Sequence, residues 1–263
     1  MAKSVKRSQP PLWQQYPNPD QSFNAVVRHY SQQTDVEWHQ HSWLQAYWVH
    51  SGVVHVFLQT HLQLAAPGQL LLLAPHTQHG AYFPKHTRLI ALNWRPNIAT
   101  DINGAILTTC PAFLAALLQQ AADNRPSTHL YQSALQTLFA TELQLVCTSI
   151  PVAAEPPIPL PQHKMLRRLL IRYIQGPKPA ETLAQLCRHV GSSESTVQRL
   201  FQQQLGMSFR QWKQAYHAEK AKRLLSSGAS MTDIAEALGM ADASSVYKML
   251  KRLQPIKEPS TPS

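Results

Sequence analysis

The sequence of 263 residues predicts an α+β multidomain protein. We expect an antiparallel β-barrel followed by two helices, and then an all-α domain with two helix-turn-helix units. Short apolar runs separated by turn residues fill residues 24–94. Apolar residues recur at helical spacing from about residue 111, and a helix, turn, helix pattern occurs twice after residue 162. Strands between turns favour a barrel, whereas helical periodicity favours packed helices.

Composition limits the class of protein. Hydrophobic residues make up 44% and charged residues 14% of the chain, which permits two cores. We find no apolar run long enough to span a membrane and no secretion signal, so we expect a cytoplasmic protein. The three cysteines, Cys110, Cys147 and Cys187, are far apart, which argues against a disulfide framework and a paired-cysteine metal site.

Proline divides the chain. Residues 149–161 contain five prolines, which neither a helix nor a central strand tolerates. We therefore expect a first domain at 23–148, an extended linker at 149–161 and a second domain at 162–255. We expect residues 1–22 to form a flexible arm and residues 256–263 a tail.

The first domain changes from strands to helices. Apolar runs predict strands at residues 25–30, 44–50, 53–59, 70–74, 81–83 and 89–94. Leucines at helical spacing predict helices at about 111–122 and 128–148, with Pro111 and Pro126 near their starts. Such helices need an apolar partner, either the barrel or a second copy of the chain, and we expect a homodimer.

The second domain begins with an amphipathic helix at 166–174 and a first helix-turn-helix unit. Gly191 separates two helices, and the Ser193 hydroxyl is a suitable N-cap for the second. A long helix then runs from Ser208 to Gly228. Its predicted apolar face consists of Phe209, Trp212, Tyr216, Ala221, Leu224 and Leu225.

The unit then repeats. Ser230 and Asp233 have capping-box spacing, Gly239 follows Gly191 by 48 residues, and Asp242 can cap the last helix. Two such units joined by one helix can place two recognition helices in major-groove segments about 34 Å apart on one face of DNA.

Positive charge gathers in this second domain. Residues 161–263 hold 16 Lys and Arg against 7 Asp and Glu, a net +9 of the chain's total of +10. A small basic domain beside a near-neutral one is typical of a protein that binds a polyanion. Two helix-turn-helix patterns in this basic segment therefore predict double-stranded DNA as the partner.

Candidate DNA-contacting residues lie at the starts and along the outer faces of the two recognition helices. In the first unit they are Ser193, Glu194, Ser195, Gln198, Arg199 and Gln202. In the second they are Ala243, Ser244, Tyr247, Lys248 and Lys251. Arg199 and Lys251 are equally suited to phosphates, and Glu194 to the positive end of its helix dipole.

These residues resemble a known family. The segments LAQLCRHVGSSESTVQRLFQQQLGMSFRQW, AKRLL and IAEALGMADASSVYKMLKR, within about 165–253, are similar to the AraC/XylS-type DNA-binding domain. The resemblance implies a transcription regulator, activator or repressor, with RNA polymerase as a further partner. The chain departs from the family at Met240, Val246 and Leu250, where aromatic residues are usual, and lacks the usual closing segment. These departures predict a second unit that packs less firmly or reads bases less specifically.

Histidines concentrate in the first domain. Nine of the thirteen lie between His29 and His86. The order His39-x-His41-x3-Gln45-x6-Gly52, then Gly68, then Pro75-x3-His79 resembles the two signature segments of the cupin barrel over about residues 37–83. The resemblance implies a His-x-His pair on one strand that points into the barrel.

Two ligand hypotheses follow. His39, His41 and His79, with Gln45 as a fourth ligand in place of the usual carboxylate, suit a divalent transition metal such as Ni, Zn, Co, Cu or Fe(II). Alternatively, the barrel holds an organic effector between Trp38, Trp43, Trp48 and Tyr82, and the histidines are polar anchors or inherited scaffold. We interpret His50, His55 and His61 as surface residues of strands, with a second metal cluster as a minor alternative.

Two other classes compete with a ligand-responsive regulator. A cupin-type metal-dependent enzyme is compatible with the His-x-His segment, but gives no reason for tandem helix-turn-helix units in a basic segment. A constitutive architectural DNA binder gives no reason for an ordered barrel. We therefore predict a regulator without enzymatic activity.

Overall fold

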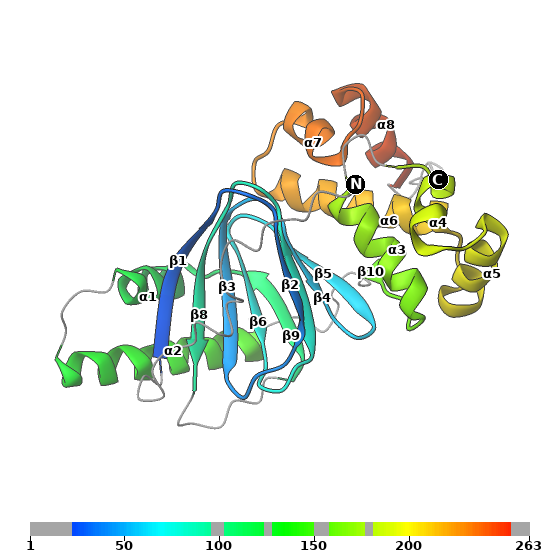
Figure 1. The fold of residues 1–263 in the computed structure, drawn as a ribbon. Helices are drawn as coiled ribbons and strands as arrows, with labels where there is room; N and C mark the ends of the chain where they lie inside the picture. Colours follow the sequence, from blue (N-terminus) through cyan, green and yellow to red (C-terminus); the bar gives the residue numbers. More distant parts are fainter. Residues whose placement is uncertain (1–22, 96–102, 124–127, 150–157, 177–180, 254–263) are drawn as a thin grey trace, which may run out of the picture. The chain divides into compact units, whose positions relative to one another are not determined.

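The computed structural model describes residues 23–95, 103–123, 128–149, 158–176 and 181–253 (Figure 1). The predicted arm, the predicted tail and Pro126 lie outside the described residues. The chain divides into two compact units. We call Met1–Gln59 with Ala65–Pro156 the first unit, and Thr60–Leu64 with Pro157–Ser263 the second unit.

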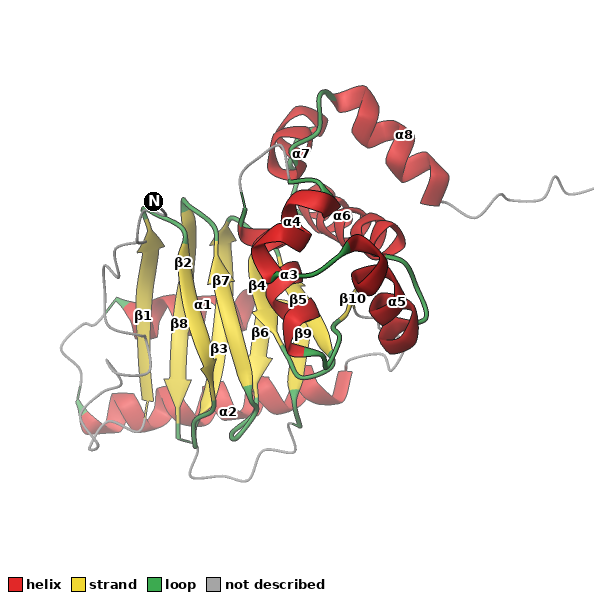
Figure 2. Ribbon diagram, turned by 45° about the vertical axis from the view of Figure 1, so that its right-hand side comes forward, coloured by secondary structure: helices red, strands yellow, loops and turns green. Residues whose placement is uncertain are grey.

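Antiparallel strands form two five-stranded sheets (Figure 2). Their orders are β1-β8-β3-β6-β9 and β10-β5-β4-β7-β2. The strands are β1 (Phe23–Tyr30), β2 (Thr34–His39), β3 (Leu44–Ser51), β4 (Val54–Phe57), β5 (His61–Ala65), β6 (Gln69–Leu73), β7 (His79–Phe83), β8 (Thr87–Trp94), β9 (Ala105–Thr109) and β10 (Ile158–Pro159). The two antiparallel sheets confirm the predicted β fold class of the first domain.

Alternation along the strands gives each sheet two faces. On β3, Tyr47 and Val49 belong to a core that includes strands of both sheets. Their neighbours Leu44 and Ala46 belong to a second core on the outer face of the first sheet. Both faces of β3 are therefore buried, which explains its nearly continuous apolar sequence.

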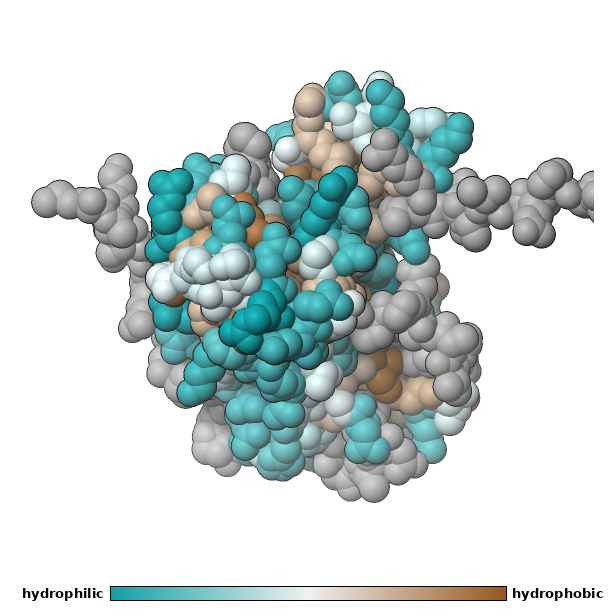
Figure 3. All heavy atoms as spheres, turned by 90° about the vertical axis from the view of Figure 1, so that its right-hand side faces the viewer, coloured by the Kyte–Doolittle hydropathy of each residue, from teal (hydrophilic) through white to brown (hydrophobic). Residues whose placement is uncertain are grey.

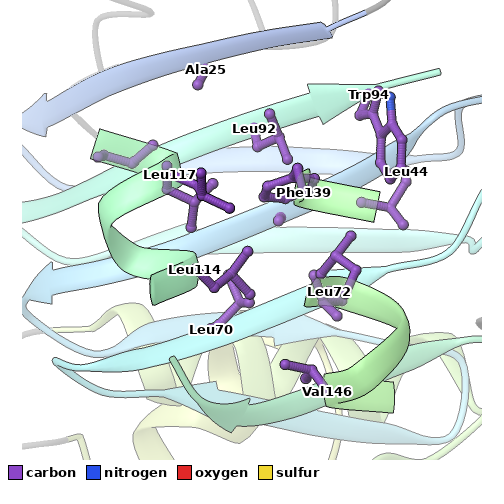
Figure 4. Close-up of a cluster of buried hydrophobic side chains, with 14 of the residues drawn as sticks. Ala25, Leu44, Leu70, Leu72, Leu92, Trp94, Leu114, Leu117, Phe139 and Val146 are labelled. Carbon is purple, nitrogen blue, oxygen red and sulfur yellow. The ribbon is translucent and has the colours of Figure 1, made fainter. Parts of the chain in front are cut away.

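Two helices cover that outer face (Figure 4). They are α1 (Ala112–Ala122) and α2 (His129–Ser149), close to the predicted bounds. Leu114 and Leu117 of α1 and Phe139 and Val146 of α2 point toward the strands. The barrel is therefore one apolar partner of these helices.

A turn glycine connects β3 of the first sheet to β4 of the second sheet. Gly52 has φ +79°, a left-handed conformation that side chains rarely adopt. A Cβ atom at this position would lie 2.5 Å from the Thr87 Oγ1 atom. Only glycine fits this turn without displacing Thr87.

The sequence pattern missed several strands. β2 and β5 lack long apolar runs because polar residues alternate with apolar ones along them, and β9 has only three apolar residues, followed by two threonines. β10 falls in the proline-rich linker, where we expected only extended chain. It pairs with β5 at the sheet edge, where proline is tolerated, and its Pro159 carbonyl accepts a hydrogen bond of 2.7 Å from Trp212 Nε1.

The second unit is otherwise helical. Its helices are α3 (Lys164–Gln175), α4 (Leu183–Val190), α5 (Glu194–Leu205), α6 (Phe209–Ser226), α7 (Met231–Leu238) and α8 (Ala243–Leu253). Tyr173 of α3 packs edge-on against Phe209 and Trp212 of α6. The prediction for Leu225 was wrong, because this residue is 37% exposed at the last turn of α6, beyond the buried face.

Candidate functional site

Three histidines meet at one end of the double sheet. His39 ends β2, His79 begins β7, and the two are paired in register across the strands. His41 lies beyond β2, so the expectation of a single strand carrying both His39 and His41 was wrong. The pairing register of β2 and β7 shifts between Val36 and His39.

The backbone of the neighbouring turn holds His41. The His41 carbonyl accepts a hydrogen bond of 2.7 Å from the backbone N–H of His76. His76 has φ +62°, which is uncommon for a residue with a side chain and marks a tight turn before β7. The turn therefore brings the segment after β2 against the start of β7.

The imidazole rings form one cluster. The centroid of the His79 ring lies 4.4 Å from that of His39 and 5.2 Å from that of His41. One ring nitrogen from each histidine lies within 4.8 Å of the other two. His41 and His79 are buried, and His39 is half-buried.

Backbone carbonyls fix the tautomer of every ring. The Nδ1 atoms of His39, His41 and His79 each lie 2.8 Å from a carbonyl oxygen two residues away in sequence. Because a carbonyl oxygen only accepts, these contacts favour a proton on Nδ1 and a lone pair on Nε2 in a neutral ring, although His41 Nε2 also lies 3.4 Å from the acceptor Gln45 Oε1. His79 Nε2 is buried and has no hydrogen-bond partner.

Burial keeps two of these rings neutral. Desolvation lowers the pKa of His79 to about 3, and the neighbouring rings of His39 and His41 lower it further. Desolvation also lowers the pKa of His41, against hydrogen bonds with the Trp43 carbonyl and Gln45. These nitrogens are therefore lone-pair donors at neutral pH.

Gln45 lies beside the cluster in a hydrogen-bond network of its own. Its Oε1 atom is 3.4 Å from His41 Nε2 and accepts a hydrogen bond of 2.8 Å from the Tyr47 hydroxyl. Its amide nitrogen donates to Asn93 Oδ1 at 3.1 Å. Tyr47 and Asn93, which sequence reasoning missed, thus orient the predicted fourth ligand.

Aromatic side chains border His41. The Trp43 ring stacks on the His41 ring with centroids 4.6 Å apart and planes 8° from parallel. The Arg95 guanidinium carbon lies 5.8 Å from the centroid of Trp43. Trp43 therefore restricts rotation of the His41 ring.

Other predicted pocket residues lie elsewhere. Trp48 packs against the outer core beneath α1 and α2. Tyr82 alternates with the inward-facing Ala81 and Phe83, and its ring lies 5.4 Å from that of His55. Trp48 and Tyr82 therefore do not line the interior between the sheets. The surface prediction for His55 was also wrong, since this residue is fully buried on β4.

The first helix-turn-helix unit has the predicted turn. α4 ends at Gly191, which has φ +68° in the left-handed region. The Ser193 hydroxyl accepts a hydrogen bond from the backbone N–H of Thr196, as an N-cap does. Thr182 and Gln185 form a capping box at the start of α4, and their spacing is visible in the sequence.

The second helix-turn-helix unit has the same caps and turn as the first. Ser230 and Asp233 form the predicted capping box, and α7 ends at Gly239 with φ +65°. The Asp242 carboxylate accepts a hydrogen bond of 2.7 Å from the backbone N–H of Ser245.

In the second helix-turn-helix unit, the residues that depart from the AraC/XylS-type pattern lie in the core. Val246 is fully buried with Ile234 and Leu238, and Met240 and Leu250 pack against this cluster. Smaller side chains thus take the place of the aromatic residues usual in the family.

The recognition helices present their candidate residues to solvent. All six candidates around α5 are exposed, as are those of α8 except the half-buried Ala243. Arg199 donates to Gln203 Oε1 at 3.1 Å, so this arginine is held along the helix surface. The face shown in Figure 3 is largely hydrophilic.

Comparison with known proteins identifies the helical domain. Residues 186–254 match a helix-turn-helix domain family of the AraC type, which confirms the resemblance of this region. No curated protein sequence matches the chain. None of the described helices is long and apolar enough to cross a membrane.

Solved structures similar to this chain were also found, all at low identity. ToxT from Vibrio cholerae has 12% identity and a TM-score of 0.39, covering 88% of this chain and 93% of that one. ToxT with a bound unsaturated fatty acid has 11% identity and a TM-score of 0.38, covering 90% and 93%. An RmlC-like cupin from Shewanella frigidimarina has 24% identity and a TM-score of 0.27, covering 29% and 68%.

Proposed function

We propose that this protein is a sequence-specific transcription regulator whose DNA affinity responds to a divalent transition metal bound by His39, His41 and His79. The observation that carries the DNA-binding half is the pair of helix-turn-helix units, with both recognition helices exposed in the region that matches an AraC-type domain. The observation that carries the sensing half is the cluster of one ring nitrogen from each of the three histidines, all within 4.8 Å of one another.

The donor set fits a metal ion. Each of the three histidines has its Nδ1 atom 2.8 Å from a backbone carbonyl oxygen, an arrangement that leaves Nε2 available to a metal ion. Ligating histidines in metalloproteins usually donate the other ring nitrogen in this way. The buried Nε2 of His79 lacks a hydrogen-bond donor, and a cation satisfies such an atom.

The chemistry of the ligands favours borderline metals. Imidazole suits Zn, Cu, Ni, Co and Fe(II), whereas Mg and Ca prefer oxygen ligands. Among the described residues, the cluster contains no carboxylate. Gln45 contributes an uncharged oxygen beside His41, held by Tyr47 and Asn93.

The response requires only thermodynamic linkage. A metal that binds more tightly to the DNA-competent state of the chain raises its DNA affinity, and a metal that prefers the other state lowers it. A coupling of 1–3 kcal/mol, the usual range, changes DNA affinity by about 5–150-fold.

The test uses the full-length protein. A DNA probe is selected from a random duplex library, and its affinity is measured with and without each metal ion. We expect one metal per chain and a metal-dependent change in DNA affinity, both lost in the variant His39→Ala/His41→Ala. The matched control His29→Ala/His50→Ala removes two exposed histidines and retains the response.

The outcomes separate the hypotheses. A protein that binds DNA but no metal refutes the metal site and directs the search to an organic effector of the same domain. A protein that selects no DNA sequence refutes the regulator. A flat dependence of DNA affinity on salt would also argue against DNA as the partner, since phosphate contacts release counterions.

A further inference from the structure

The chain directly before α3 is held along its length. We call residues 158–163 the docked segment. Its strand β10 pairs with β5, and Ile158 is in register with Leu62. The backbone N–H of Leu160 donates a hydrogen bond of 2.8 Å to the Thr60 carbonyl. Ile158 and Leu160 are buried, as is Leu62. The docked segment therefore binds the β5 strand through its backbone and its side chains.

Side chains from three helices bind the backbone of the same segment. Trp212 of α6 donates from Nε1 to the Pro159 carbonyl at 2.7 Å. Arg167 of α3 donates from Nε to the Pro161 carbonyl, also at 2.7 Å. The third side chain is that of Gln204, in the recognition helix α5. Six residues thus connect β5 to α3, α5 and α6, and all of these elements belong to the second unit.

Gln204 makes the connection to the first recognition helix. Its Oε1 atom accepts hydrogen bonds from the backbone N–H groups of Gln162 at 2.9 Å and His163 at 3.1 Å. His163 is the N-cap of α3, and its own side chain makes no capping hydrogen bond. Gln204 therefore supplies an acceptor that the start of α3 needs, and in doing so joins the last turn of α5 to that start.

Gln204 lies away from the face of α5 that carries most of the candidate DNA-contacting residues. It follows Gln202 by two positions, which is about 200° around the helix. It is only about 60° from Phe201, which is fully buried. Gln204 is therefore placed to affect the position of α5 and not the contacts of its outer face.

We propose that the docked segment fixes the orientation of the first recognition helix relative to β5, with Gln204 as the positioning residue. A recognition helix binds DNA well only when it is held in the geometry that brings its side chains to the groove. By linkage, a contact that favours the DNA-bound state is itself strengthened by DNA. The inference deepens the proposed function, and it rests on the proposed DNA binding and not on the metal site.

Hydrogen exchange of the full-length protein, measured by mass spectrometry, tests the inference. The docked segment has only four backbone amides, because residues 159 and 161 are prolines. Three of these amides donate the hydrogen bonds to Thr60 and Gln204. We expect slow exchange of the segment, which the selected DNA probe slows further by about fivefold, the usual contribution of one hydrogen bond. In Gln204→Ala the segment should exchange faster and should not respond to DNA.

The affinity for the selected DNA probe is the second readout. Gln204→Ala should bind the probe about fivefold more weakly than the parent protein. Gln204 is exposed, so its truncation leaves no cavity in the core. Gln204→Glu keeps an acceptor oxygen and should retain the slow exchange of the segment. The control Gln214→Ala removes another exposed glutamine, on α6, and should change neither exchange nor affinity.

The outcomes are distinct from those for the proposed function. Equal DNA affinity of Gln204→Ala and the parent protein overturns the inference and leaves the regulator intact. The same holds if DNA does not alter the exchange of the docked segment in the parent protein. A parent protein that selects no DNA sequence refutes the proposed function, and the inference with it.

Discussion

The two candidate sites are built in opposite ways. The histidine cluster is buried, and backbone carbonyls fix the orientation of its rings. The recognition helices are rigid at their caps but expose polar side chains to solvent. A small ion needs a few preoriented atoms at short range, whereas DNA needs a fixed helix that presents side chains over a long surface.

The largest effect is expected from removing two of the three clustered histidines. The variant His39→Ala/His41→Ala should lower metal affinity by more than about 100-fold, since losing a single supporting partner already costs 10–100-fold. Isothermal titration of the full-length protein measures this. DNA binding without metal should persist, which separates the two sites. Unchanged metal affinity would remove these histidines as ligands.

Single contacts on the recognition helices should matter less. Arg199→Ala or Lys251→Ala should weaken DNA binding by about 1–3 kcal/mol if the side chain contacts bases, and should relax specificity at one position. A phosphate contact instead reduces the slope of log affinity against log salt by about one. Titrations at several salt concentrations distinguish the two roles, and unchanged affinity for both variants would remove these residues from the interface.

Acid should destabilise the first unit through its buried histidine. The folded-state pKa of His79 is about 3, below the ordinary value of 6.5 for histidine. As the pH falls, the unfolded chain is therefore protonated at His79 before the folded chain is. The free energy of unfolding falls as the pH drops from about 6.5 toward 3, by up to about 1.4 kcal/mol per pH unit.

Urea unfolding of metal-free protein at several pH values measures whether the free energy of unfolding falls as the pH falls. His79→Asn should flatten the dependence between about pH 6 and 4, in the window below the ordinary histidine pKa. His29→Asn, at an exposed position, should leave it unchanged. An equally steep dependence in His79→Asn would contradict the assignment to His79.

The smallest expected effect concerns helix caps. Ser193→Ala removes the side-chain acceptor for the backbone N–H of Thr196 and should cost about 1 kcal/mol of stability in the second unit. Thermal unfolding measures the loss. Gln202→Ala changes an exposed residue of the same helix that is not the N-cap, and serves as the control. Equal stability of Ser193→Ala and wild type would show that the cap contributes nothing.

The difference between the histidine cluster and the recognition helices also explains which features could be predicted from the sequence. Gly191, Ser193, Ser208, Ser230 and Gly239 were predictable because caps and turns depend on residues close together in the chain. His39, His41 and His79 were candidate ligands through the resemblance of two separate segments to the cupin signatures. Their fixed tautomers were not predictable, because backbone carbonyls carry no signal in the sequence.

The wrong predictions involve long-range packing. His55 alternates with apolar residues and reads as a surface position, but the outer face of its strand is covered. Trp48 points to the outer core because α1 and α2 pack there. The pairing of β10 with β5 joins segments about a hundred residues apart, which no local pattern indicates.

The central claim is that metal at the histidine cluster changes DNA affinity. The most direct measurement is the affinity of full-length protein for its selected DNA, with and without bound metal, in wild type and in His39→Ala/His41→Ala. We predict a metal-dependent change of about 5–150-fold in wild type and none in the variant. Equal metal responses in the two proteins, or a stoichiometric metal with no effect on DNA affinity, would contradict this account.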